Sequence, residues 1–250
     1  MEDPLYTLRF FEEIIDERHK NITGITITKG GRLKIGKKRS KAGYMLSLLL
    51  IMGPRFFTRN VLKTLSFKTR KKIPFVQEPG LKSIAERYNI PVDYTDNPNS
   101  GEYLDKLRKR EPDVLINQSQ FIIKKELLDI PKIGVLNRHN ALLPKNRGRL
   151  TPFWVLYKQE NETGLSIHFV DEGIDSGPIV VQKKFPVSEK DSFKSVVERN
   201  YKLASNAMLE ALNLLENGYS DFIENSDDEA TYNTVPTLKE AFEFRKRRMW

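Results

Sequence analysis

Three polar residues in the second half of the chain have side chains that could carry out acyl transfer: Asn137, His139 and Asp175. An Asn amide offers N–H donors that do not titrate, a His ring exchanges a proton near neutral pH, and an Asp carboxylate accepts a proton. Donors that face a carboxylate suit direct transfer, because they stabilise the developing oxyanion while the carboxylate takes the proton of the attacking group. Each of the three is also common in turns, so residue type alone does not decide.

Other kinds of chemistry have less support. Ser166 and Ser176 lack the strand-to-helix elbow of a serine nucleophile, so we expect no covalent serine step. The chain has no Cys, which excludes disulfides, thiolate zinc sites and cysteine nucleophiles, and its three His residues form no metal-binding motif.

The elements before the Asn–His pair alternate between short apolar strands and amphipathic helices. We expect strands at residues 24–28, 74–77, 91–94, 113–117 and 133–136, and helices at residues 8–20, 44–53, 81–88, 104–110 and 124–128. The alternation indicates an α/β fold with a Rossmann-like, mostly parallel sheet and helices on both faces. Ligands of such sheets bind beyond the carboxyl ends of the strands, and Asn137 directly follows one of these ends.

The second half of the chain changes in character. Two strands are expected at residues 163–170 and 178–183, and the loop between them, DEGIDSG, contains Asp175. A long helix is expected at residues 192–217, ending at a Gly. No long linker divides the chain, so we predict one catalytic domain, residues 1–218, and a C-terminal extension, residues 219–250.

The net charge of +9 is concentrated in one segment, because residues 29–72 contain 14 Lys or Arg and no Asp or Glu. Such a segment attracts a phosphate-bearing substrate, RNA or an anionic membrane surface, although a solvated basic face is the simpler interpretation. The most apolar run, residues 45–52, is too short to cross a bilayer, and the N-terminus does not resemble a signal peptide. We expect a cytoplasmic protein.

Residues 133–182 resemble the folate-dependent formyltransferase family, which includes the glycinamide ribonucleotide, methionyl-tRNA and sugar N-formyltransferases. Four ordered motifs carry the resemblance: NRH at 137–139, LPKNRG at 143–148, TGLSIHFV at 163–170 and DEGIDSG at 171–177. The resemblance implies a formyltransferase fold and an enzyme that takes its formyl group from 10-formyltetrahydrofolate.

The resemblance also implies a role for each polar residue of the motifs. Asn137 would donate a hydrogen bond to the formyl oxygen, and His139, held by the Leu-Pro loop that follows it, would stabilise the charge of the intermediate. Asp175 would take the proton of the amine through an ordered water, and His168 would support the site and contact Asp175.

The family holds the pterin ring in the loop that follows the strand at residues 113–117. The matching positions here are Phe121, Ile122 and Ile123. An apolar slot with backbone hydrogen bonds suits a flat heterocycle, but packing in the core is an equally good explanation for Ile122 and Ile123.

Two features depart from the family pattern. Ala141 replaces a Ser that the family usually has, which affects loop hydrogen bonding more than catalysis. The apolar strand that opens the family fold has no counterpart before the first helix, so we expect the first strand to be missing.

The acceptor is the least determined part of the function. The residues after Gly218 are too few for the additional domain of methionyl-tRNA formyltransferases, and residues 1–30 contain no glycine-rich phosphate loop of the glycinamide ribonucleotide enzymes. We therefore favour a small, phosphorylated amine such as an amino sugar nucleotide. Three alternatives remain: a tRNA acceptor, an inactive homologue that binds folate or a nucleotide, and, least favoured, a nucleic-acid-binding module.

Overall fold

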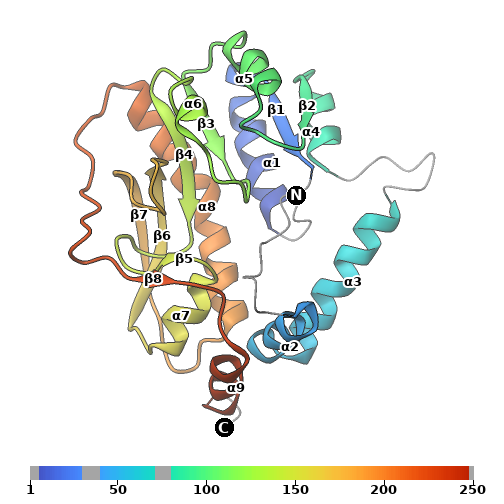
Figure 1. The fold of residues 1–250 in the computed structure, drawn as a ribbon, viewed down its shortest axis with the longest axis vertical. Helices are drawn as coiled ribbons and strands as arrows, with labels where there is room; N and C mark the ends of the chain where they lie inside the picture. Colours follow the sequence, from blue (N-terminus) through green and yellow to red (C-terminus); the bar gives the residue numbers. More distant parts are fainter. Residues whose placement is uncertain (1–5, 30–39, 71–79, 248–250) are drawn as a thin grey trace.

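The computed structural model describes residues 6–29, 40–70 and 80–247 (Figure 1). The strand expected at residues 74–77 lies outside these residues. Within them, no helix is long and apolar enough to cross a membrane.

The other predicted helices and strands of the sheet are confirmed within a few residues. The helices are α1 Thr7–Arg18, α2 Lys41–Met52, α3 Pro54–Arg70, α4 Leu81–Arg87, α5 Gly101–Arg108, α6 Lys125–Leu128, α7 Thr151–Tyr157, α8 Phe193–Glu216 and α9 Leu238–Arg247. The strands are β1 Ile25–Thr28, β2 Val92–Thr95, β3 Val114–Asn117, β4 Gly134–His139, β5 Arg147–Gly148, β6 Glu162–Phe169, β7 Ile179–Pro186 and β8 Tyr232–Asn233. Sequence reasoning did not foresee α3, α7 and α9, nor the short strands β5 and β8.

The α/β class is confirmed, and the sheet is mixed. Its four described strands follow the order β3-β4-β6-β7, in which β3 and β4 are parallel and the other two pairs are antiparallel. Helices α1 and α8 pack on one face through a cluster that includes Phe10, Leu136 and Met208. Helices α5 and α6 cover the other face through Leu104, Leu127 and their neighbours. The sheet is therefore buried on both sides, as expected of a Rossmann-like arrangement.

Strand β4 is longer than predicted, and this changes where the polar pair lies. We expected the strand to end before Asn137, but the ladder continues through His139, which pairs with Ser166 of β6. Residues two apart on a strand point to the same face. The side chains of Asn137 and His139 therefore lie on one face at the carboxyl end of β4, within the sheet itself.

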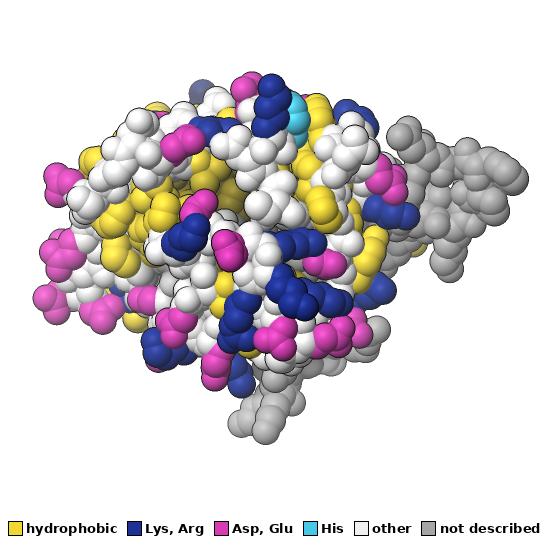
Figure 2. All heavy atoms as spheres, turned by 90° about the horizontal axis from the view of Figure 1, so that it is seen from above, with side chains coloured by type: hydrophobic (Ala, Val, Ile, Leu, Met, Phe, Trp, Pro, Cys, Tyr) yellow, Lys and Arg dark blue, Asp and Glu magenta, His cyan; other side chains and the backbone are white. Residues whose placement is uncertain are grey.

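Strands β1 and β2 form a separate parallel pair. No described strand lies between β1 and β3. A cavity of about 560 Å³ occupies this position, lined by β1, β3 and apolar side chains such as Phe11, Ile14 and Leu212. Figure 2, which looks onto this end of the molecule, shows apolar side chains around a hollow.

The described part of the basic segment is mostly helical. The helix expected at residues 44–53 does end before Pro54, but a further helix, α3, begins at this Pro after Gly53, whose φ is 74°. Proline suits the first position of a helix, since its missing N–H would have no partner there. Helix α3 projects from the body (Figure 1), with Leu62 and Leu65 exposed.

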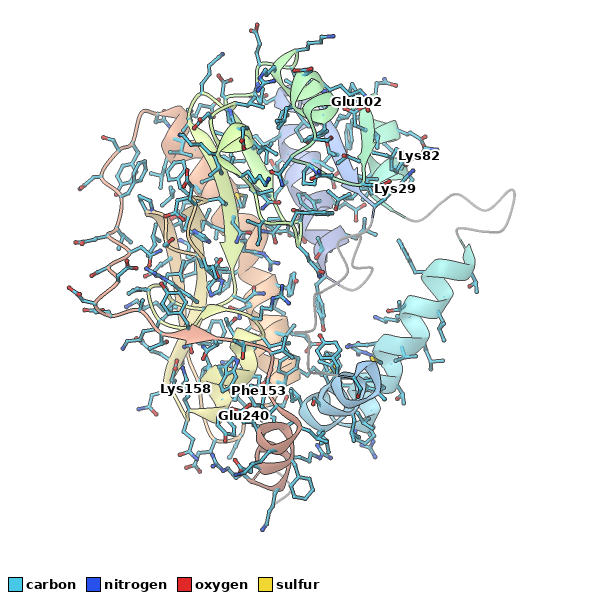
Figure 3. All side chains as sticks on the ribbon, in the orientation of Figure 1. Lys29, Lys82, Glu102, Phe153, Lys158 and Glu240 are labelled. Carbon is cyan, nitrogen blue, oxygen red and sulfur yellow. The ribbon has the colours of Figure 1, made fainter. Side chains whose placement is uncertain are left out.

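The C-terminal segment packs closely against the rest of the structure. Strand β8 pairs with β5, and the indole N–H of Trp154 donates to the carbonyl of Thr234 at 2.9 Å. Near the lower end of the molecule, Phe153 of α7 meets Phe244 of α9 with their ring centroids 5.1 Å apart (Figure 3). Residues 219–247 thus form a strap across the domain, which we call the C-terminal strap.

Candidate active site

The fold brings together the polar residues that the motifs singled out. Asn137 is paired with His168 in the β4–β6 ladder, and the loop after β6 carries Asp175 back over both. Oδ2 of Asp175 lies 3.4 Å from Nδ1 of His139, and its Oδ1 lies 3.7 Å from Nε2 of His168. The side chains of His139, Asp175 and His168 are only 6%, 16% and 2% exposed, so bulk water screens their charges weakly.

The Leu-Pro loop holds His139, as the sequence indicated. Nε2 of His139 lies 2.8 Å from the carbonyl oxygen of Asn146, which can only accept, so Nε2 carries a proton. The side chain of Asn146 is in turn bonded by Glu160, Lys158 and Asn233. Nδ1 of His139 is therefore the ring nitrogen that is left to act on a substrate beside Asp175.

His168 is held in the neutral form. Its Nδ1 lies 2.7 Å from the carbonyl oxygen of Phe169 and therefore donates to it. Burial, helped by repulsion from His139, lowers the pKa of His168 to about 4, although Asp175 acts in the opposite direction. At neutral pH, Nε2 of His168 therefore has a lone pair, which faces Nδ2 of Asn137 at 3.4 Å.

Two neighbours hold Asp175. The backbone N–H of Gly148 donates to Oδ2 of Asp175 at 2.8 Å, and Nδ2 of Asn225 donates to the carbonyl oxygen of Asp175 at 2.9 Å. Gly148 must be glycine, because its φ is 99° and a Cβ there would lie 2.2 Å from the carbonyl oxygen of Asn233. The carboxylate is thus placed by β5 and by the C-terminal strap.

Arg147, which sequence reasoning passed over, joins this strap to the site. Its side chain is fully buried, and its guanidinium bonds to Asp227, to the hydroxyl of Tyr232 and to the backbone and side-chain oxygens of Asn225. The only signal in the sequence for a role of Arg147 was its place directly before Gly148 in the LPKNRG motif. The partners lie about 80 residues further on and could not be foreseen.

The three residues predicted to cradle a pterin have different environments. Ile122 is 85% exposed and Phe121 is half-buried, so both have apolar surface that a flat ring could cover. Ile123 is 6% exposed within the core cluster below α5, so packing in the core explains its side chain. The side-chain amide of Asn99 holds this loop, because its Nδ2 donates to the carbonyl of Ile122 and its Oδ1 accepts from the N–H of Lys124.

The described residues offer no group of three or more His, Cys, Asp or Glu side chains that could hold a metal ion.

The buried His168 predicts how stability depends on pH. Because the pKa is lowered from 6.5 to about 4 in the folded state, the unfolded chain alone takes up a proton between these values. The free energy of unfolding should therefore fall as the pH drops from 6.5 towards 4, by at most about 3 kcal/mol from this group. Urea denaturation at about pH 7.5 and about pH 5 measures the difference.

His168→Asn is the informative variant, because its amide nitrogen can still donate to the carbonyl of Phe169 but does not titrate. We expect the free energy of unfolding to depend less on pH in this variant than in the parent protein. In His19→Gln, whose ring is only half-buried, we expect the same pH dependence as in the parent. A pH dependence as steep in His168→Asn as in the parent protein would contradict the assignment.

Comparisons with known proteins identify a family and a shared fold. A family model described as formyl transferase matches residues 69–212. The methionyl-tRNA formyltransferase of Kosmotoga olearia is 32% identical over 153 residues, which cover 61% of this chain and 49% of that protein. This chain spans about half the length of the curated relatives it matches.

Two solved structures share the fold. Glycinamide ribonucleotide transformylase 1 from Symbiobacterium toebii matches with a TM-score of 0.52 and 20% identity, over 79% of this chain and 89% of that one. The N-formyltransferase from Helicobacter canadensis, in complex with folinic acid and dTDP-3-aminofucose, matches with a TM-score of 0.52 and 18% identity. That match covers 68% of this chain and 64% of the other.

Proposed function

This chain belongs to the formyl transferase family, and from that premise we propose that it moves a formyl group from 10-formyltetrahydrofolate to an amine by direct attack. The observation that carries the proposal is the meeting of Asn137, His139 and Asp175 at the carboxyl end of β4. Nothing in this arrangement requires a covalent enzyme intermediate, because an amine is itself a nucleophile.

In the proposed reaction the amine nitrogen attacks the formyl carbon, and the bond from that carbon to N10 of tetrahydrofolate breaks. Nδ2 of Asn137 donates to the oxygen as it becomes negative, and His139, as the imidazolium, donates to it from Nδ1. Asp175 takes the proton that leaves the amine, directly or through a water, and the proton ends on N10.

For the donor we propose the loop after β3. Ile122 and Phe121 would cover one face of the pterin, and the backbone between residues 118 and 124 would bond its polar edge. This loop lies beyond the carboxyl end of β3, which is where ligands of open α/β sheets bind. His168 contributes by accepting a hydrogen bond from Nδ2 of Asn137 and need not touch the pterin.

For the acceptor we propose a small phosphorylated amine, such as an amino sugar nucleotide. The basic segment could bind its phosphates, and Lys29, Arg55 and Lys63 are among its described cations. The Helicobacter canadensis enzyme, which shares the fold, was solved with such a nucleotide. Methionyl-tRNA is the second candidate, because curated relatives that are about a third identical to this chain are named methionyl-tRNA formyltransferases.

An acceptor panel tests the proposal. Release of tetrahydrofolate from 10-formyltetrahydrofolate would be followed by absorbance with amino sugar nucleotides, methionyl-tRNA and glycinamide ribonucleotide. We expect turnover with one of the three. Tight folate binding without turnover on any amine would instead favour an inactive binding homologue.

The salt dependence of the acceptor KM separates the two main candidates. A nucleotide sugar with two phosphates makes few ionic contacts, so we expect KM to rise by at most about tenfold between about 50 and 200 mM salt. Binding of a tRNA whose backbone is held by six or more cations would weaken by about a thousandfold over the same range, and KM would rise accordingly. KM measured across this range with the active acceptor gives the answer, and a thousandfold rise would contradict the small-acceptor proposal.

A further inference from the structure

A glutamine that belongs to none of the four motifs lies directly behind Asn137. Gln118 follows β3, and its Nε2 donates to Oδ1 of Asn137 at 2.8 Å. The same Nε2 donates to the backbone carbonyl of Asn117, also at 2.8 Å. On its other side, Oε1 of Gln118 accepts from Nε and Nη2 of Arg138 at 3.2 and 3.0 Å.

The chemistry of these partners leaves each amide only one way to turn. A guanidinium has donors and no acceptor, so the atom of Gln118 that faces Arg138 must be the oxygen. A backbone carbonyl only accepts, so the atom that faces Asn117 must be the nitrogen. Gln118 therefore presents an N–H to Asn137, and Asn137 must turn its oxygen towards Gln118 and its Nδ2 towards the site.

The hydrogen bond on the other side of Asn137, to His168, requires the same orientation of the Asn137 amide. Nδ1 of His168 donates to the carbonyl of Phe169, so Nε2 is the acceptor that faces Nδ2 of Asn137 at 3.4 Å. Both neighbours of Asn137 thus require the same orientation of its amide. An amide turned the other way would bring oxygen against the lone pair of His168 and nitrogen against the N–H of Gln118.

Hydrogen bonds and an aromatic ring, and no carboxylate of a described residue, surround the guanidinium of Arg138. Its side chain is buried, and no carboxylate among the described residues lies within ion-pair distance. The guanidinium lies over the ring of Tyr201, 4.2 Å from the centroid, and bonds to the hydroxyl of Tyr201 and to Asn140. A buried cation without a carboxylate is costly unless its donors are used, and two of the donors go to Gln118.

From these contacts we propose that Gln118 is a positioning residue, which aims Nδ2 of Asn137 at the formyl oxygen and is itself held in the required orientation by Arg138. The proposal rests on the proposed function for the role of Asn137. It adds that a residue outside the four motifs determines which atom of the Asn137 amide faces the site. Gln118 need not touch either substrate.

A double-mutant cycle tests whether Gln118 acts through Asn137. Gln118→Met keeps the length of the side chain and removes both polar atoms, and we expect kcat to fall by about tenfold while KM for the folate changes little. In the Asn137→Ala background, whose kcat is itself about a hundredfold lower, the same change should cost less than about twofold. Gln159→Met, at an exposed position after α7 and outside the proposed site, should leave kcat unchanged. An equal loss in both backgrounds would overturn the proposal.

Gln118→Glu tests the direction of the relay. A carboxylate can pair with Arg138 but cannot donate to Asn137, so Asn137 would turn its Nδ2 away from the site. We expect kcat to fall by about a hundredfold, more than in Gln118→Met, although the new ion pair with Arg138 is favourable. A Gln118→Glu protein as active as the parent would overturn the proposal.

Nuclear magnetic resonance separates this proposal from the proposed function. If the parent protein turns over no acceptor, the proposed function fails, but the side-chain amide signals of Asn137 still report its hydrogen bonds. We expect these signals to move in Gln118→Glu and Gln118→Met and to stay in place in Gln159→Met. Unchanged signals in both Gln118 variants would show that Gln118 does not position Asn137.

Discussion

Asp175→Asn should lower kcat for formyl transfer by about a thousandfold, with little change in folding stability. The substitution removes the carboxylate that lies 3.4 Å from His139 and 3.7 Å from His168, so the proton of the attacking amine loses its acceptor. The loop should survive, because the amide oxygen of the new Asn can still accept the N–H of Gly148, and Asn225 bonds to the backbone of this residue. Single-turnover rates with a saturating acceptor measure the effect.

Asp171→Asn is the matched control in the same loop. Oδ1 of Asp171 accepts from the N–H of Gly173 and the hydroxyl of Ser176, and an Asn oxygen can accept both bonds. We expect the activity of this variant to stay within about twofold of the parent. Equal rates in Asp175→Asn and the parent would remove Asp175 from proton transfer, whatever the identity of the acceptor.

The sequence predicts the site well where the site depends on local geometry. Asn137 and His139 were expected just past the end of an apolar strand, and the longer ladder of β4 places them on one face. Asp175 lies in a glycine-containing loop that directly follows the strand of His168, so the antiparallel ladder brings it back over β4. The motifs therefore single out the set, whereas the length of β4 had to come from the structure.

The residues that hold the set could not be predicted, because their contacts join distant parts of the chain. Arg147 bonds to Asp227, 80 residues further on, and Gln118 bonds to Asn137 across the β3–β4 pair. In the sequence Arg147 resembles any loop cation, and only the fold shows that it is buried. Helix α3 was missed for a local reason, since Pro54 both follows the end of α2 and is the first residue of the next helix.

The burial of Arg147 leads to the largest expected effect on stability. Arg147→Met keeps the apolar length of the side chain but removes the hydrogen bonds to Asp227, Tyr232 and Asn225. We expect a loss of about 3 kcal/mol, because the carbonyl of Asn225 is left without its charged donor. Asp227 adds little to this loss, since its side chain is 82% exposed and water can take over its bonds. For a chain of this size the melting temperature should fall by roughly 6 to 12 °C, which calorimetry measures.

The same substitution should also lower activity at temperatures where the protein stays folded. Asn225 bonds both to Arg147 and to the backbone of Asp175, so a loosened C-terminal strap no longer fixes the carboxylate, and we expect kcat to fall by about tenfold. Arg149→Met is the control, because this neighbouring side chain is exposed and only its backbone bonds to the strap. If Arg147→Met were less stable but fully active, the strap would stabilise the fold without placing Asp175. If both variants lost stability equally, burial of Arg147 would not be the cause.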